Sequence, residues 1–175
     1  MYGRSATKRC IDKSGSRAGN WGLLRWDAAA LEQRIKALHP PRKACSCSPI
    51  CMGGPAWQFK KFADASSRPW LSQAWRDKLA AGFSNSASVN GDKFSTIEYF
   101  WTLSQQHGQI WIGTGLLPSN TKAHGPADVN WTAGFGGAIA VSPSDASPEE
   151  APRAGDLETA RLLGRRVAEF AERIA

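Results

Sequence analysis

The sequence predicts an α/β fold in which an open, mostly parallel sheet is flanked by helices. First, short apolar runs alternate with amphipathic helical patterns from residue 55 to the C-terminus, as in strands joined by helical crossovers. Second, these apolar runs are nearly continuous, which is typical of strands buried on both faces. Third, the chain has 175 residues, of which 42% are hydrophobic, enough for one domain with a buried core.

The first helix and strand of this pattern follow Pro55. Residues 56–66 place apolar side chains at helical spacing: Ala56, Phe59, Phe62 and Ala63. Pro69 is expected to end this helix, because the residue before a proline is pushed out of the helical region. The apolar run at residues 79–83 then predicts a buried strand, and the polar residues 84–91 predict a loop.

A second helix is expected after that loop. Asp92 can cap its start, and Gly108 suits its C-terminal end. The apolar stripe of this helix consists of Phe94, Ile97, Phe100, Trp101 and Leu103. Residues 109–113 indicate the next strand, and residues 137–141 indicate a strand that resumes after an excursion. The excursion, residues 114–136, is rich in Gly, Pro and Asn, so we expect a functional or oligomer-forming segment.

The last element is a helix at the C-terminus. A proline-rich loop at residues 142–155 precedes it, and Asp156 is expected to cap it. Its apolar face is formed by Leu157, Ala160, Leu163, Val167, Ala171 and Ile174.

The first fifty residues do not continue the pattern. They carry ten Lys and Arg against three Asp and Glu, whereas residues 51–175 carry twelve of each sign. The basic pI therefore describes one segment of the chain. Only residues 44–50 favour a strand, and its serines and proline make it a weak one. We expect residues 1–47 to form an atypical, basic, Cys-containing segment and residues 48–175 to form the domain.

Targeting signals are not evident in the sequence. No apolar run is long enough to span a bilayer, and residues 1–20 lack the apolar core of a signal peptide. A cytoplasmic location is expected.

Two loops of the predicted sheet are suited to a ligand. In open α/β sheets the ligand lies beyond the carboxyl ends of the strands, where residues 49–55 and 84–91 are expected. Glycines let the backbone approach a flat cofactor, and short Ser and Asn side chains offer donors and acceptors to a polar ring edge. The same residue types dominate ordinary turns, so spacing alone leaves both interpretations open.

Three segments resemble one protein family. Residues 48–64, beginning Ser-Pro-Ile-Cys-Met-Gly-Gly-Pro, resemble the third-strand loop and following helix of flavodoxin-like NAD(P)H:quinone oxidoreductases of the tryptophan-repressor-binding-protein type. Residues 78–86 and 101–108 are similar to the next strand, flavin loop and helix, and residues 155–174 resemble the terminal helix. The resemblance implies a flavodoxin-like open, mostly parallel sheet with flanking helices.

The same resemblance implies a site and its chemistry. FMN is the implied cofactor, NAD(P)H the co-substrate and a quinone the acceptor of two electrons. The implied FMN contacts are Pro49, Ile50, Cys51, Met52, Gly53, Gly54, Ser84, Asn85, Ser86, Ala87 and Ser88. Cys51 stands where the family usually has Tyr, Phe or Arg.

His107 is the implied catalytic residue, because it matches a histidine that lies near the flavin in this family. There it would hydrogen-bond a quinone oxygen or stabilise charge after hydride transfer. The alternative is a histidine that merely ends a helix. The tryptophans of this region are expected in the core or in subunit contacts, and a homo-oligomer, dimer or tetramer, is expected.

One part of the family pattern is not found. The family binds the FMN phosphate with a Ser, Thr and Gly loop between its first strand and first helix. No apolar strand followed by such a loop precedes Pro49. We therefore expect the fold to lack this strand and loop, through deletion or a wrong reading frame upstream. An inactive, truncated flavodoxin-like protein is the alternative function.

The N-terminal segment allows two further hypotheses. A zinc ion or cluster could be held by Cys10, His39, Cys45, Cys47 and Cys51. Their spacing is not that of a standard finger, so free thiols and no metal are expected. The basic residues, with Trp21 and Trp26 for base stacking, could bind nucleic acid. No recognised motif supports this, and a solvated, disordered segment is favoured.

Overall fold

The computed structural model describes residues 43–174, with side chains from residue 46 onward. The strands of this part of the chain are β1 Lys43–Cys51, β2 Gly54–Pro55, β3 Leu79–Ser86, β4 Ile110–Trp111 and β5 Ala138–Val141. Its helices are α3 Trp57–Ala65, α4 Ser67–Leu71, α5 Lys93–Gln106 and α6 Ala154–Arg173.

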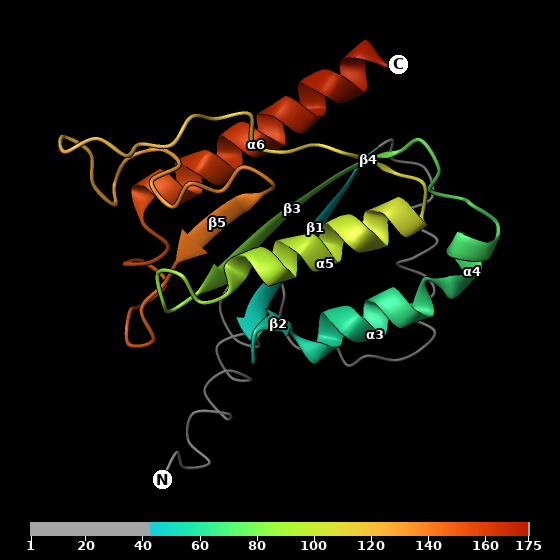
Figure 1. Ribbon diagram of the computed structural model, residues 1–175, viewed down its shortest axis with the longest axis horizontal. Coiled ribbons are helices and arrows are strands. Elements are labelled where there is room, and N and C mark those ends of the chain that lie inside the picture. Colours follow the sequence, from blue (N-terminus) through green and yellow to red (C-terminus); the bar gives the residue numbers. More distant parts are fainter. Residues whose placement is uncertain (1–42, 175) are drawn as a thin grey trace, which may run out of the picture.

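The strands form one sheet centred on β3 (Figure 1). β1 runs parallel to β3 in a register that extends from Lys43 opposite Leu79 to Pro49 opposite Asn85. β4 and β5 share the other edge of β3, with β4 beside its first residues and β5 beside its last four. Only the short β2 is antiparallel, and it folds back on the end of β1. The predicted open, mostly parallel sheet is confirmed.

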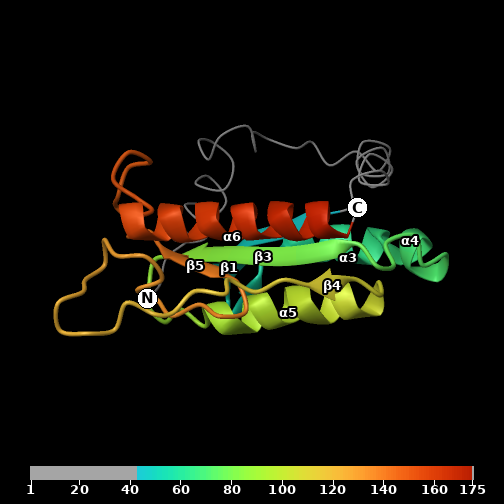
Figure 2. The same ribbon diagram turned by 90° about the horizontal axis from the view of Figure 1, so that it is seen from above.

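Helices cover both faces of the sheet, with α6 on one side and α5 on the other (Figure 2). Successive strand residues point to opposite faces. Leu79 and Ala81 of β3 therefore meet Leu163 and Val167 of α6 in the buried core. On the other face Gly82 lets α5 approach closely.

The predicted role of Pro69 and the predicted end of the strand at residue 83 were wrong. α3 ends at Ala65, and Pro69 lies inside the short helix α4 instead of terminating α3. A proline is tolerated there because the first turn of a helix needs no N–H donor to a preceding turn. β3 extends three residues past the predicted strand, to Ser86, because its polar end pairs with both β1 and β5.

The predicted capping roles of Asp92 and Asp156 were also wrong. Asp92 holds the N-cap position of α5, but its φ is +51° and its side chain makes no capping hydrogen bond. α6 begins two residues before Asp156, whose Oδ2 instead accepts the N–H of Val141 at 2.9 Å. Gly108, with φ +66°, follows α5 in the left-handed conformation that suits a helix end.

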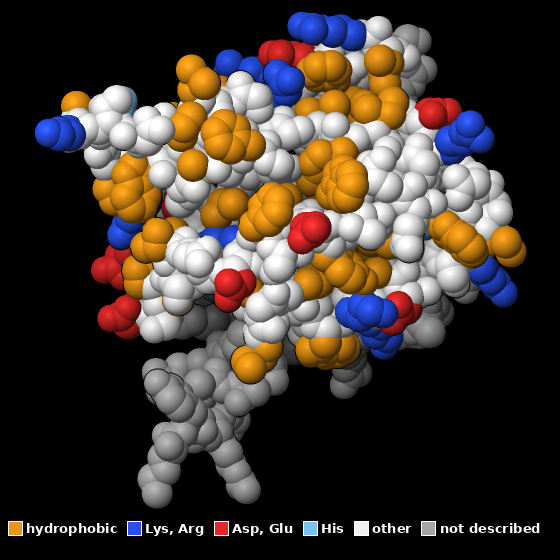
Figure 3. Space-filling view, in the orientation of Figure 1, with side chains coloured by type: hydrophobic (Ala, Val, Ile, Leu, Met, Phe, Trp, Pro, Cys, Tyr) orange, Lys and Arg blue, Asp and Glu red, His pale blue; other side chains and the backbone are white. Residues whose placement is uncertain are grey.

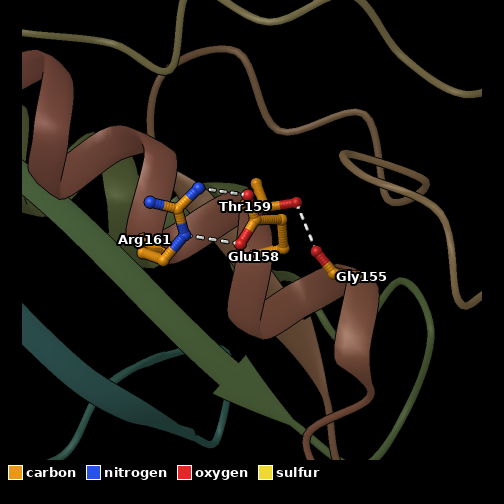
Figure 4. A network of polar contacts seen from close by, with 4 residues as sticks. All are labelled: Gly155, Glu158, Thr159 and Arg161. Atoms are coloured by element: carbon orange, nitrogen blue, oxygen red, sulfur yellow. Dashed lines mark hydrogen bonds and ion pairs between the residues drawn. The ribbon is translucent and has the colours of Figure 1, made fainter.

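The excursion at residues 114–136 contains no helix or strand, as predicted, and buried polar contacts attach it to α6. The backbone N–H of Asn130 donates to Thr159 Oγ1 at 2.7 Å. Thr159 in turn donates to the carbonyl one helical turn earlier, as Figure 4 shows beside the exposed ion pair of Glu158 and Arg161. The excursion is therefore a packed part of the domain.

Most of the expected N-terminal segment lies outside the described residues. This applies to Cys10, His39, Trp21 and Trp26, and so to most of the zinc and nucleic-acid hypotheses. Residues 43–47 form the start of β1. The sheet therefore begins before residue 48, where the domain was expected to start.

Within the described part of the chain, no group of three or more His, Cys, Asp or Glu residues is placed to hold a metal ion. Burial raises the pKa of the Cys47 thiol to about 11, so this thiol stays protonated near neutral pH. The helices of residues 43–174 include none that is long and apolar enough to cross a membrane.

Candidate functional site

Two loops meet at the carboxyl ends of β1 and β3. Pro49 lies opposite Asn85 in the parallel register, so the loop that follows each strand leaves the same edge of the sheet. β5 ends beside them, with Val141 opposite Ser86. This edge is where open α/β sheets bind ligands. The structure thus brings together the eleven residues that the sequence predicted as cofactor contacts.

The first loop is a tight turn between β1 and β2. Met52 and Gly53 adopt left-handed conformations, with φ +51° and +79°, and the Met52 side chain is fully exposed. A Cβ added at Gly53 or Gly54 would meet no atom within 4 Å, so space is open beside this backbone. The turn is held from outside by Ser95 of α5, whose Oγ donates to the carbonyl of Gly53.

Buried serines fix the base of both loops. Ser48 Oγ accepts the N–H of Ala56 at 2.9 Å, which fixes the return of the chain into α3. Ser84 Oγ donates to the carbonyl of Ser48 at 2.9 Å and so links β3 to β1. Ser84, a predicted site residue, and Ser48, which was not predicted, therefore shape the loops, and both are buried.

Asn85 presents an incomplete hydrogen-bond set at this edge. Its Nδ2 donates to Ser142 Oγ at 2.9 Å, whereas its Oδ1 is buried and has no partner among the described residues. Either orientation of the amide leaves one polar atom unpaired. Buried polar atoms normally have a partner, so the free end of this amide marks a position for a ligand atom or water.

The second loop also exposes backbone donors. Ala87 and Ser88 are exposed. None of the N–H groups of residues 87–92 donates to an acceptor within residues 43–174. An exposed row of N–H donors suits the acceptor atoms of a polar ring edge or an anion.

The described residues fit the ring side of FMN. Open backbone at Gly53 and Gly54, the unpaired amide atom of Asn85 and the free donors of residues 87–92 offer space, donors and acceptors to a flat polar ring. The stretch before β1, where the family carries its phosphate loop, lies outside the described residues.

His107, the predicted catalytic residue, does not lie at the carboxyl edge of the sheet with the two loops. Because α5 starts beside the end of β3 and runs back along the sheet, its C-terminal residue His107 lies beside the amino ends of the strands. The 14 residues of α5 span about 21 Å at 1.5 Å per residue. The sequence already indicated this position, because the helix of a parallel crossover returns the chain to the start of the next strand, and His107 ends such a helix.

His107 is instead part of the core. It is 1% exposed, lies 4.2 Å from Trp75 between ring centroids, and has Nε2 2.8 Å from Ser66 Oγ. Ser66 Oγ donates to the carbonyl of Ala63, so His107 Nε2–H is the donor to Ser66. Its Nδ1 is buried without a partner in the described residues, and burial lowers the pKa of His107 to about 4. The alternative of a helix-ending histidine agrees with this position.

Three contributors to the site were missed by sequence reasoning. Ser95 and Ser142 bond to the loops, and Lys93 Nζ donates to the carbonyls of Ser88 and Val89. Ser142 follows β5 directly, so the rule that ligands lie at carboxyl ends of strands would have found it. Lys93 carried no signal, because a lysine at the start of a helix ordinarily extends into solvent.

An open parallel sheet with two loops at the carboxyl ends of adjacent strands places the chain among the open α/β proteins, a class that includes the flavodoxin-like fold. Comparison with known proteins agrees. The chain is 48% identical to flavodoxin FldP of Pseudomonas aeruginosa over 127 residues. The matched residues make up 73% of this chain and 68% of that protein. It is similar to a WrbA-like flavodoxin from Agrobacterium tumefaciens with a TM-score of 0.63 and 42% identity, over 81% of this chain and 73% of the other. The chain belongs to this WrbA-like flavodoxin family.

A further relative is named NAD(P)H dehydrogenase (quinone). The protein of Archaeoglobus fulgidus is 31% identical over 127 residues, or 73% of this chain. The chain spans 58% of the length of that protein. No family model matches the sequence.

Proposed function

We propose that the chain binds FMN and serves as an NAD(P)H:quinone oxidoreductase. The single observation that carries this proposal is the unpaired polar atom of Asn85, buried beside free backbone donors at the carboxyl edge of the sheet. The names of its relatives, a flavodoxin and an NAD(P)H dehydrogenase (quinone), support the same function. When bound, FMN supplies the redox chemistry, accepting hydride from NAD(P)H and giving two electrons to the quinone.

The chain itself contributes binding and orientation. Residues 49–54 would flank the ring, with Gly53 and Gly54 permitting close approach. The free end of the Asn85 amide would hydrogen-bond a heteroatom of the ring, and residues 87–90 would direct N–H groups at its polar edge. Tethers from Ser95 and Ser142 hold both loops in place before any ligand arrives, so less order must be gained on binding.

Proton transfer to the quinone would not depend on His107. The eleven predicted contact residues include no His, Asp, Glu or Lys. We therefore propose that protons reach the reduced quinone from water at the open edge of the site. In that case the rate of quinone reduction shows no titration of a histidine in the range where an exposed imidazole changes charge, near pH 6.5.

The test is to purify the full chain with excess FMN and to record its visible spectrum. Bound flavin that is bleached by NAD(P)H and restored by a quinone is the expected result. Asn85→Ala is expected to weaken FMN binding by about tenfold, because it removes a buried ring contact. Asn120→Ala, at an exposed position in the excursion, is the matched control. A colourless chain would favour an inactive, truncated member of the family.

We also propose that the chain assembles as a homo-oligomer, a dimer or tetramer, through the α5 face. α5 exposes large apolar side chains away from the sheet, with Phe94 66% and Trp101 48% exposed. Apolar side chains gather over this face in Figure 3. Contiguous exposed apolar surface commonly marks a protein interface.

A further inference from the structure

Lys93, the first residue of α5, is buried in a position where lysine normally reaches solvent. Its side chain is 1% exposed, and its Nζ donates to the carbonyl of Val89 at 2.9 Å and to that of Ser88. Removing an ammonium group from water is costly unless hydrogen bonds replace the water. Burial lowers the pKa of Lys93, and the nearby carboxylate of Asp156 opposes this shift.

The loop is built to close over this ammonium group. A Cβ at Gly91 would lie 2.2 Å from Ser86 Oγ and 3.3 Å from Lys93 Nζ, so only glycine fits, and its φ of +53° is also one that glycine favours. The backbone N–H of Lys93 donates to the carbonyl of Asn90 at 3.3 Å. Consecutive carbonyls of the loop thus point inward, toward one residue.

This arrangement turns the N–H groups of the loop outward. A trans peptide unit points its C=O and its N–H in opposite directions. Because the carbonyls of Ser88, Val89 and Asn90 face Lys93, the N–H groups of Val89, Asn90 and Gly91 face away from it. Val89 and Asn90 are exposed, so these donors are open to a ligand at the carboxyl edge of the sheet.

Stability of α5 does not explain a lysine at this place. The N-terminus of a helix carries partial positive charge, and a cation there is unfavourable. The sequence offers α5 no acidic residue in its first turn to offset this charge. The contacts of Lys93 are with the loop, so its role lies there.

We propose that Lys93 is a positioning residue that gives the loop at residues 84–91 its ligand-accepting shape. It touches no ligand and transfers no proton or electron. Its ammonium holds the carbonyls of Ser88 and Val89 inward, and the loop then presents N–H donors to the acceptor edge of the bound ring. The identity of that ring as FMN rests on the proposed function, whereas the shape of the loop does not.

The experiment compares Lys93→Met, Lys93→Gln and Lys93→Arg with Lys61→Met, which alters an exposed lysine on α3. Hydrogen exchange is measured on each full chain without FMN, and FMN affinity is measured by fluorescence titration. In Lys93→Met the amide of residue 93, whose N–H donates to the carbonyl of Asn90 and closes the loop, is expected to exchange about tenfold faster, after correction for side-chain identity, while those of β3 are unchanged. FMN affinity is expected to fall by about tenfold.

Lys93→Arg, which keeps a charged donor, is expected to recover part of both properties, and Lys61→Met to match the wild type. If Lys93→Met does not fold, Lys93→Gln takes its place. Unchanged exchange of the residue 93 amide in a folded variant would overturn the proposal, as would equal loss in the Arg and Met variants. Failure of the wild type to bind FMN would refute the proposed function alone, since exchange without FMN still tests Lys93.

Discussion

Acidification is expected to destabilise the fold through His107. In the unfolded chain a histidine titrates near pH 6.5, whereas burial lowers the pKa of His107 to about 4 in the folded protein. Between these values the unfolded state binds a proton that the folded state does not, so stability is lost as the pH falls from 6.5 toward 4. Below pH 4 both states are protonated and no further loss arises from this group.

The magnitude follows from the width of that window. A pKa difference of about 2.5 units, between 6.5 and about 4, corresponds to about 3 kcal/mol of unfolding free energy at 1.36 kcal/mol per unit. Such a loss is a large fraction of the free energy of unfolding of an ordinary domain, which is roughly 5–15 kcal/mol. A second imidazole proton would be carried by Nδ1, which is buried without a partner among the described residues. The neighbouring Trp75 ring offers this N–H no acceptor.

Urea unfolding, followed by tryptophan fluorescence at several pH values, measures this effect. Carboxylates titrate in the same range, so the informative quantity is the difference between the wild type and His107→Gln, whose side chain does not ionise. The wild type is expected to lose about 3 kcal/mol more than the variant between pH 7 and 4. His124→Gln, in the exposed excursion, serves as control and should follow the wild type. Parallel pH curves for the wild type and His107→Gln would refute this reasoning.

Two further predictions concern packing and assembly. Gly82→Ala is expected to cost about 2 kcal/mol in urea unfolding, because its Cβ would lie 2.9 Å from the Phe100 ring, while Gly164→Ala, with open space on α6, should be neutral or stabilising. An unchanged midpoint for Gly82→Ala would show that α5 can move away. Trp101→Glu is expected to lower the mass measured by light scattering toward that of a monomer, whereas Leu157→Glu on α6 should leave it unchanged. Equal masses for both variants would exclude the α5 face as the interface.

Periodicity in the sequence identified α3, α5 and α6 and the central strand β3, because burial of one helix face or of a whole strand imposes a pattern on the chain itself. It did not place the end of β3, where Ser84 and Asn85 are polar yet pair with strands on both sides. Nor did it find the bond of Asp156. The partner of this side chain, the N–H of Val141, belongs to strand β5 and reaches Asp156 only in the folded chain.

Some features of the candidate site were likewise predicted from the sequence and others were not. Both loops were predicted, since glycines and short polar residues after a strand have a physical meaning at any ligand-binding edge. His107 lies away from both loops because α5 runs back along the sheet, a direction that the family likeness alone did not reveal. Lys93 was missed because sequence alone does not reveal that a loop folds back over a lysine.

The shared edge of β3 has a consequence for how this chain tolerates change. β4 and β5 are two halves of a single strand position, and the excursion enters and leaves between them. Its ends stay together, with the N–H of Thr114 donating to the carbonyl of Phe135 at 3.0 Å. Residues added at its exposed positions 120–124 would therefore leave the pairing of β3 intact, since the cost of closing a loop rises only slowly with its length. The excursion is therefore a place in the domain where residues can be inserted without a change in the pairing of the sheet.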